Sequence, residues 1–260
     1  MKEKFLITVG CAVFVCSAAP LFAESTNIAE DDAAQSAYGG SWENGKSGGT
    51  GFGNWTQATE GSGENRHAGF FIASTSNNSD LNGIAKEDKA FGLFANGTAF
   101  EQAVAYRALD KPLAVGDSFS FMLETSAFEK KFDKDDTSGG AIGLTLRSGN
   151  ANSLVTDYNS GALFELGHYQ GKTTYQIFDG SDKPDSGVAF TDQGISVTVT
   201  LTGADTYDLE IQTMKDKNVT KLPGRKFSSS GSIESLAVFN RNSEKHDAYF
   251  NQFQVSRESQ

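Results

Sequence analysis

The sequence predicts an all-β protein, a two-sheet antiparallel β-sandwich of the jelly-roll type. Apolar residues alternate with polar residues along many short segments, and no stretch of about ten residues has a helical period. The chain also contains 28 glycines among 260 residues. Glycine- and asparagine-rich turns separate roughly eleven or twelve candidate strands, a spacing typical of sandwiches.

The clearest alternation lies in the second half of the chain. Every second position is apolar in 195–201 and again in 207–211, and Gly203-Ala204-Asp205 lies between these segments. This pattern predicts a hairpin. The other candidate strands are 69–73, 90–95, 99–109, 119–123, 142–146, 175–177, 233–239 and 249–255.

Residues 38–55 combine many glycines with Tyr38, Trp42 and Trp55. Part of this stretch, 40–47, matches the letters of a phosphate-binding loop, and 45–49 matches those of a nucleophile elbow. Both motifs require a buried strand before and a helix after, and the flanking residues form neither. We therefore expect a glycine/aromatic loop that leads into a first strand.

The ends of the chain divide it into three parts. Residues 1–23 have the basic start, apolar segment and small-residue end of a secretory signal peptide, and both cysteines, Cys11 and Cys16, lie there. Residues 24–37 are polar and acidic, so we expect a flexible lead-in. Residues 38–257 have the length of one β-sandwich domain. The sequence thus predicts a secreted, periplasmic or extracellular bacterial protein without disulfides.

The chain is acidic. Its formal net charge of −11 becomes −12 without residues 1–23, because that segment contributes two lysines and one glutamate. An acidic surface repels nucleic acid and anionic lipid. No second apolar segment is long enough to span a membrane. A polysaccharide or a cell-envelope component is the expected partner.

Five segments resemble a group of secreted bacterial proteins that are similar to the concanavalin A-like lectin/glucanase jelly rolls. They are 49–55, 90–96, 113–117, 200–207 and 248–255. The resemblance implies a concanavalin A-like sandwich and carbohydrate binding. It also implies a structural Ca²⁺ ligand at Asp247, just before the last strand. The E-x-D-x-E strand pattern of the superfamily's glycosidases is absent.

The candidate carbohydrate-binding residues are Trp42, Tyr158, Tyr169 and Glu165. Aromatic rings can stack on the apolar face of a pyranose, and Trp42 stands among polar neighbours, so we expect it to be exposed. Trp55 and Tyr106 are further candidate rings, with Trp55 more typical of a core position. Glu165 and Tyr169 lie on the same face of one strand, which suits a sugar contact or an ordinary polar face.

Catalysis would require two facing carboxylates. The strand carboxylates are Glu124, Glu165, Asp208 and Glu210, and the last two form a solvated strand face or, alternatively, a pair on an open sheet surface. Residues 133–139 begin like a calcium loop but lack its glycine and its final glutamate. His168 shares a strand face with Phe164 and Leu166, which predicts a core position.

These observations support three hypotheses. The first is a secreted, non-catalytic sandwich that binds carbohydrate or another extracellular polymer. The second is a structural or adhesive envelope protein without a small-ligand pocket. The third is a glucanase-like glycosidase with an unfamiliar arrangement of carboxylates.

Overall fold

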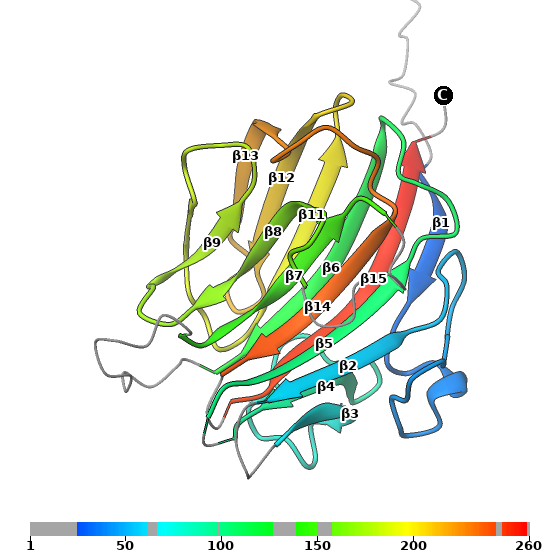
Figure 1. Cartoon of the computed structure of the whole chain (residues 1–260), viewed down its shortest axis with the longest axis vertical. Coiled ribbons are helices and arrows are strands. Elements are labelled where there is room, and N and C mark those ends of the chain that lie inside the picture. The colour runs from blue at the N-terminus through cyan, green and yellow to red at the C-terminus, as the bar shows by residue number, and fades with distance from the viewer. Residues whose placement is uncertain are drawn as a thin grey trace, which may run out of the picture.

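The computed structural model describes residues 25–61, 67–97, 99–126, 139–149, 158–242 and 246–258. Two antiparallel sheets of eight and seven strands pack face to face (Figure 1). The predicted all-β sandwich is thus confirmed. The expected signal peptide and residues 133–138 of the calcium-like loop lie outside the described residues.

The eight-stranded sheet has the order β13-β12-β11-β6-β15-β4-β3, and β1 pairs with the free part of β15. Its strands are β1 (Ser25–Asp31), β3 (Ala68–Ser74), β4 (Lys89–Ala95), β6 (Asp117–Thr125), β11 (Ile195–Leu201), β12 (Thr206–Thr213), β13 (Val219–Lys226) and β15 (Ala248–Glu258). The seven-stranded sheet has the order β10-β9-β8-β7-β14-β5-β2. Its strands are β2 (Thr56–Gly61), β5 (Glu101–Ala108), β7 (Ala141–Arg147), β8 (Ala162–Tyr169), β9 (Thr174–Phe178), β10 (Asp185–Ala189) and β14 (Ser235–Arg241).

Side-chain alternation builds the core between the sheets. Along β11 the buried positions alternate with half-buried ones from Ile195 to Leu201, and the predicted hairpin joins Leu201 to Tyr207 of β12. Apolar residues of both sheets form one buried cluster, which includes Phe119 and Phe121 of β6 and Leu144 of β7. The last two strands, β14 and β15, each lie inside a sheet rather than at its edge.

The described part of the expected flexible lead-in, residues 25–37, contains regular secondary structure. From Ser25 to Asp31 the chain is β1, antiparallel to β15, and a short 3-10 turn, η1 (Ser36–Tyr38), follows. Glu30 and Thr50 exchange two backbone hydrogen bonds of 2.9 Å. A Cβ at Gly49 would lie only 1.8 Å from the carbonyl oxygen of Glu30. The glycine-rich stretch therefore lets the loop backbone press against β1.

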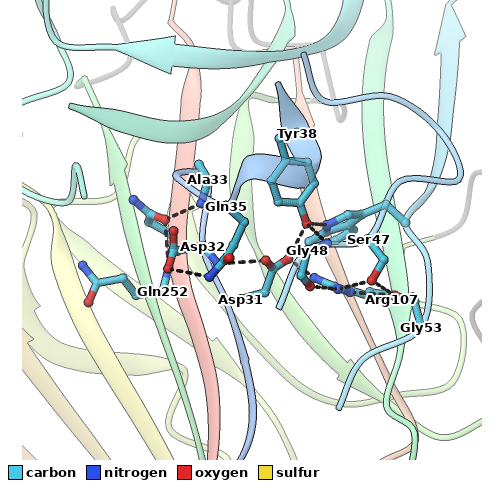
Figure 2. A network of polar contacts seen from close by, with 12 residues as sticks. Asp31, Asp32, Ala33, Gln35, Tyr38, Ser47, Gly48, Gly53, Arg107 and Gln252 are labelled. Carbon is cyan, nitrogen blue, oxygen red and sulfur yellow. Dashed lines mark hydrogen bonds and ion pairs between the residues drawn. The ribbon is translucent and has the colours of Figure 1, made fainter. Parts of the chain in front are cut away.

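A buried ion pair fixes β1 to the opposite sheet. The Asp31 carboxylate contacts both the Arg107 guanidinium and the Tyr38 hydroxyl (Figure 2). The side chains of Asp31 and Arg107 are both fully buried. Trp55 Nε1 donates to Tyr38 Oη at 3.1 Å, and Arg107 Nε donates to the carbonyl of Gly53 at 2.8 Å. The network thus joins β1, the glycine-rich loop and β5.

No helix in the described part of the chain is long and apolar enough to cross a membrane.

The variant Asp31→Ala tests this anchor. It leaves the Arg107 guanidinium buried without its carboxylate, so we expect the free energy of unfolding to fall by about 3–5 kcal/mol. Urea denaturation measures the change. Lys86→Ala is the matched control, because Lys86 pairs with Asp32 at 2.6 Å while 47% exposed, and its loss should stay below about 1 kcal/mol. Equal losses in the two variants would contradict the assignment.

Candidate ligand-binding site

A hollow of about 410 Å³ opens on the outer face of the seven-stranded sheet, beside β8 and β9. It brings together three of the four predicted carbohydrate-binding residues, Tyr158, Glu165 and Tyr169. The remaining residues that line it are Asn159, Ala162, Phe178, Asp179 and Ser228. We refer to it as the aromatic hollow.

The alternation of β8 and β9 places these side chains. Phe164 and Leu166 belong to the core between the sheets, so Glu165 and Tyr169 project from the opposite face of β8. Phe178 lies directly across from Glu165 in the antiparallel register. The floor of the aromatic hollow therefore consists of neighbouring residues from two strands.

Glu165 and Tyr169 form a coupled polar pair. The Tyr169 hydroxyl donates a hydrogen bond to Glu165 Oε1. Burial raises the pKa of Glu165, and the Tyr169 hydrogen bond and the Arg241 charge only partly oppose this effect. Burial and the adjacent Glu165 carboxylate also raise the pKa of Tyr169. The pair can offer hydrogen bonds to hydroxyl groups of a ligand, and the charge of its carboxyl group depends on the pH.

The ring of Tyr158 is a wall of the hollow rather than a free platform. It stacks on Phe239 with a centroid distance of 3.8 Å and an interplanar angle of 18°. Its hydroxyl accepts a hydrogen bond of 3.2 Å from Arg241 Nη1. These contacts fix the ring and leave it only 5% exposed.

Phe178 is the exposed ring of the aromatic hollow, and it was not among the predicted carbohydrate-binding residues. It is 47% exposed and meets Tyr169 edge-on at 5.1 Å between centroids. An exposed phenylalanine supported by a fixed neighbour is a suitable platform for the apolar face of a sugar. The alternation that buries Tyr175 and Ile177 already placed Phe178 outside the core.

The expectation that Trp42 is exposed was wrong. Its side chain is 2% exposed, and its ring packs 5.1 Å from Trp55, 5.5 Å from Phe70 and 4.9 Å from Phe91. The polar neighbours in sequence misled the prediction, because the glycine-rich loop folds back and carries the ring into the core. Trp55, at 1% exposed, occupies the core position predicted for it.

The four strand carboxylates do not converge. Glu124, Asp208 and Glu210 belong to β6 and β12 of the eight-stranded sheet, whereas Glu165 projects from the outer face of the other sheet. Glu124 is buried and accepts hydrogen bonds from three successive backbone amides, at 2.6, 2.8 and 3.1 Å. Glu210 pairs with Lys221 at 2.9 Å, and Asp208 accepts a 2.7 Å hydrogen bond from the Gly224 amide.

The second carboxylate at the aromatic hollow, Asp179, is already engaged. Its oxygens accept hydrogen bonds of 2.8 and 3.0 Å from Arg225. The Tyr207 hydroxyl donates to the same carboxylate at 2.5 Å. These contacts join the end of β9 to β12 and β13, and they give Asp179 a structural role.

His168 occupies the predicted core position, at 3% exposed. Its ring stacks on Phe190 with 4.1 Å between centroids. Burial lowers its pKa to about 4, so the imidazole is neutral at physiological pH.

Asp247 lies beside one other carboxylate. The Tyr249 hydroxyl donates to Asp80 Oδ1 at 2.7 Å and lies 3.4 Å from Asp247 Oδ2. Ca²⁺ requires six to eight oxygen ligands. Outside the gaps in the description, no three or more His, Cys, Asp or Glu side chains gather where they could hold a metal ion. The described side chains alone therefore do not complete a calcium site at Asp247.

Among the comparisons with known proteins, only those with solved structures find similar chains. No protein-family model matches the chain, and no curated protein matches it in sequence. One similar solved structure is an endo-acting O-glycanase of the human gut microbiota, at 9% identity and a TM-score of 0.51, covering 90% of this chain and 100% of that one. A legume lectin-like domain from Entamoeba histolytica gives 11% identity, coverages of 75% and 91%, and a TM-score of 0.41. The VIP36 exoplasmic/lumenal domain is 9% identical, with coverages of 74% of this chain and 84% of that one and a TM-score of 0.39. The likeness to the O-glycanase structure supports the fold alone, a two-sheet antiparallel β-sandwich of the jelly-roll type.

The variant Glu165→Gln tests the buried carboxyl group. Because the pKa of Glu165 is raised in the folded protein, its ionisation weakens folding as the pH rises through that pKa. The variant lacks this cost, so its stability relative to wild type should increase as the pH rises above the ordinary glutamate pKa of about 4.3. Thermal unfolding at pH values below and above that point measures the difference.

Asp185→Asn is the control of opposite sign. A hydrogen bond from the Gly187 amide lowers the pKa of the exposed Asp185 carboxyl. Its contribution to stability is present above the unfolded-state pKa and is lost as the pH falls. A Glu165→Gln difference that stays constant with pH would contradict the assigned environment.

The Asp247 carboxyl should titrate at about pH 6 in the folded protein. Burial raises its pKa to about 6, and the nearby Asp80 charge adds to the effect. Carboxyl-carbon NMR measures the midpoint, and Asp80→Asn should lower it by removing the neighbouring charge. If millimolar Ca²⁺ binds there, the midpoint should also fall. A wild-type midpoint near the ordinary aspartate value would contradict the described surroundings.

Proposed function

We propose that the aromatic hollow binds carbohydrate, and that the protein is a secreted binding module without catalytic activity. The observation that carries this proposal is the juxtaposition of the exposed Phe178 ring with the Glu165–Tyr169 pair. The ring offers an apolar surface to a pyranose face. The carboxylate and hydroxyl offer directional hydrogen bonds to the hydroxyl groups at the sugar edge.

Binding rather than hydrolysis agrees best with the carboxylates. Glycoside hydrolysis uses two carboxyl groups that flank the scissile bond. At the aromatic hollow Glu165 faces the ligand, while Asp179 is held by Arg225 and Tyr207. The similar O-glycanase acts in mucin breakdown. In this chain the aromatic hollow could bind a glycan but would not hydrolyse it, because Asp179 is not free to act as the second carboxyl group.

The signal peptide expected at 1–23 supports a function outside the cytoplasm. A polysaccharide or a glycosylated envelope component would then be the partner. A structural Ca²⁺ at Asp247 is a separate part of the proposal. Asp247 immediately precedes β15 of the eight-stranded sheet, whereas the aromatic hollow lies on the seven-stranded sheet. Such an ion would therefore stabilise the fold and would take no part in binding at the aromatic hollow.

The test measures binding of the mature chain from Glu24 to a panel of immobilised polysaccharides, with Ca²⁺ and with chelator. Phe178→Ala removes the stacking surface and should weaken binding about two- to thirteenfold, from ~0.5–1.5 kcal/mol of aromatic contact. Binding should persist in chelator.

Val115→Ala is the matched control, because Val115 is a 58% exposed apolar side chain outside the aromatic hollow. It should leave the affinity unchanged. If Phe178→Ala bound every polymer like wild type, the aromatic hollow would not be the site. If the wild-type chain bound none of them, the structural envelope role would replace the proposed function.

A further inference from the structure

A second hollow of about 410 Å³ lies between the turn after β9 and the edge strand β13. Three cationic side chains and three small residues shape it. They are Lys183, Arg225 and Lys226, with Gly180, Ser181 and Gly224. We refer to it as the basic hollow.

A β-bulge forms one wall of the basic hollow. The register of β12 and β13 shifts between Tyr207 and Leu209, where Pro223 and Gly224 interrupt the edge strand. Gly224 adopts a φ of +66°, and its amide is held by Asp208 at 2.7 Å. Proline and glycine permit such a bulge at a sheet edge, where it curls the strand.

The opposite wall is fixed to the bulge by backbone contacts. The Gly180 amide donates to the Lys226 carbonyl at 2.9 Å, and a Cβ at Gly180 would lie 2.3 Å from the Phe227 carbonyl oxygen. Arg225 Nη2 donates to the Lys183 carbonyl at 3.1 Å and to Asp179 at 3.0 Å. The basic hollow is therefore a preformed feature of the fold.

The charges of the basic hollow are unusual for this chain. The overall formal charge is −11, yet Lys183 and Lys226 are both exposed here. Within the described residues neither lysine forms an ion pair with a carboxylate. The Arg225 charge is balanced by Asp179. The Asp208 carboxylate accepts the Gly224 amide but keeps its negative charge, and Asp182 precedes Lys183 in the sequence. The residues that line the basic hollow nevertheless include Lys183 and Lys226 and no carboxylate, so the two ammonium groups would attract an anionic group there.

The two hollows meet along one segment of chain. Phe178 and Asp179 line the aromatic hollow, and Gly180 and Ser181 line the basic hollow. Since successive Cα atoms are about 3.8 Å apart, Phe178 and Ser181 lie within roughly 11 Å. Figure 1 shows β9 and β13 at the same side of the sandwich. A polymer that contacts Phe178 can thus reach Lys183 and Lys226.

We propose that the ligand is an acidic polysaccharide whose sugar ring stacks on Phe178 while a carboxylate or sulfate substituent enters the basic hollow. This inference rests on the proposed function, because it assigns the ligand class of the same site. The basic hollow supplies two ammonium groups and the Ser181 hydroxyl to the anion.

The test compares binding of the mature chain to polygalacturonate, dextran sulfate and neutral dextran at low and high ionic strength. We expect the acidic polymers to bind more tightly than dextran, and salt to reduce this preference. The carboxylated and sulfated polymers distinguish the two kinds of anion. The double variant Lys183→Gln/Lys226→Gln should weaken acidic-polymer binding roughly three- to tenfold and leave neutral-polymer binding unchanged.

The charge-matched control is Lys111→Gln/Lys215→Gln, which removes two exposed lysines outside the basic hollow. It should retain the preference for acidic polymers. Unchanged acidic-polymer binding in Lys183→Gln/Lys226→Gln, with loss in Phe178→Ala, would overturn this inference and keep the proposed function. Failure of every polymer to bind would overturn both. Tighter binding of single-stranded DNA than of either acidic glycan would also overturn the inference.

Discussion

The buried contact between Asp31 and Arg107 is the constraint on which the N-terminal half of the sandwich depends. Neither charge reaches water, so each needs the other. Tyr38, Trp55 and the backbone of the glycine-rich loop complete the set of hydrogen bonds around them. With this network in place, β1 lies against β15 and the glycine-rich loop covers Trp42. Arg107 connects β5 to β1 and to the loop. The ring cluster beneath the loop is thereby sealed from solvent.

The fold class could be predicted because strand alternation is a local signal. In 195–211 each side chain's burial follows from its neighbours, and the structure reproduces both strands and their turn. The strand β1 gives no such signal. Its sequence is polar, and Asp31 is buried only because Arg107, 76 positions later, supplies the compensating charge. Long-range pairing of this kind is invisible to a local pattern.

The candidate site was predictable to the same extent. Glu165 and Tyr169 share a face of one strand, so their proximity follows from a period of two. That Tyr158 joins them depends on stacking with Phe239. The position of Phe178 outside the core follows from the same period of two, because Tyr175 and Ile177 belong to the core. Trp42 shows the opposite case, in which polar sequence neighbours surround a ring that the fold buries. The basic hollow combines residues from 180–183 and 222–226, which the Asp179–Arg225 ion pair and the Gly180–Lys226 backbone hydrogen bond bring together.

The order of the strands also governs when the sandwich can assemble. The two final strands, β14 and β15, fill interior positions in the two sheets, and β15 receives the first strand. A growing chain that lacks them has a gap through the middle of each sheet. Contacts of such large sequence separation make folding slow. The polypeptide must therefore be synthesised almost to its end before either layer closes.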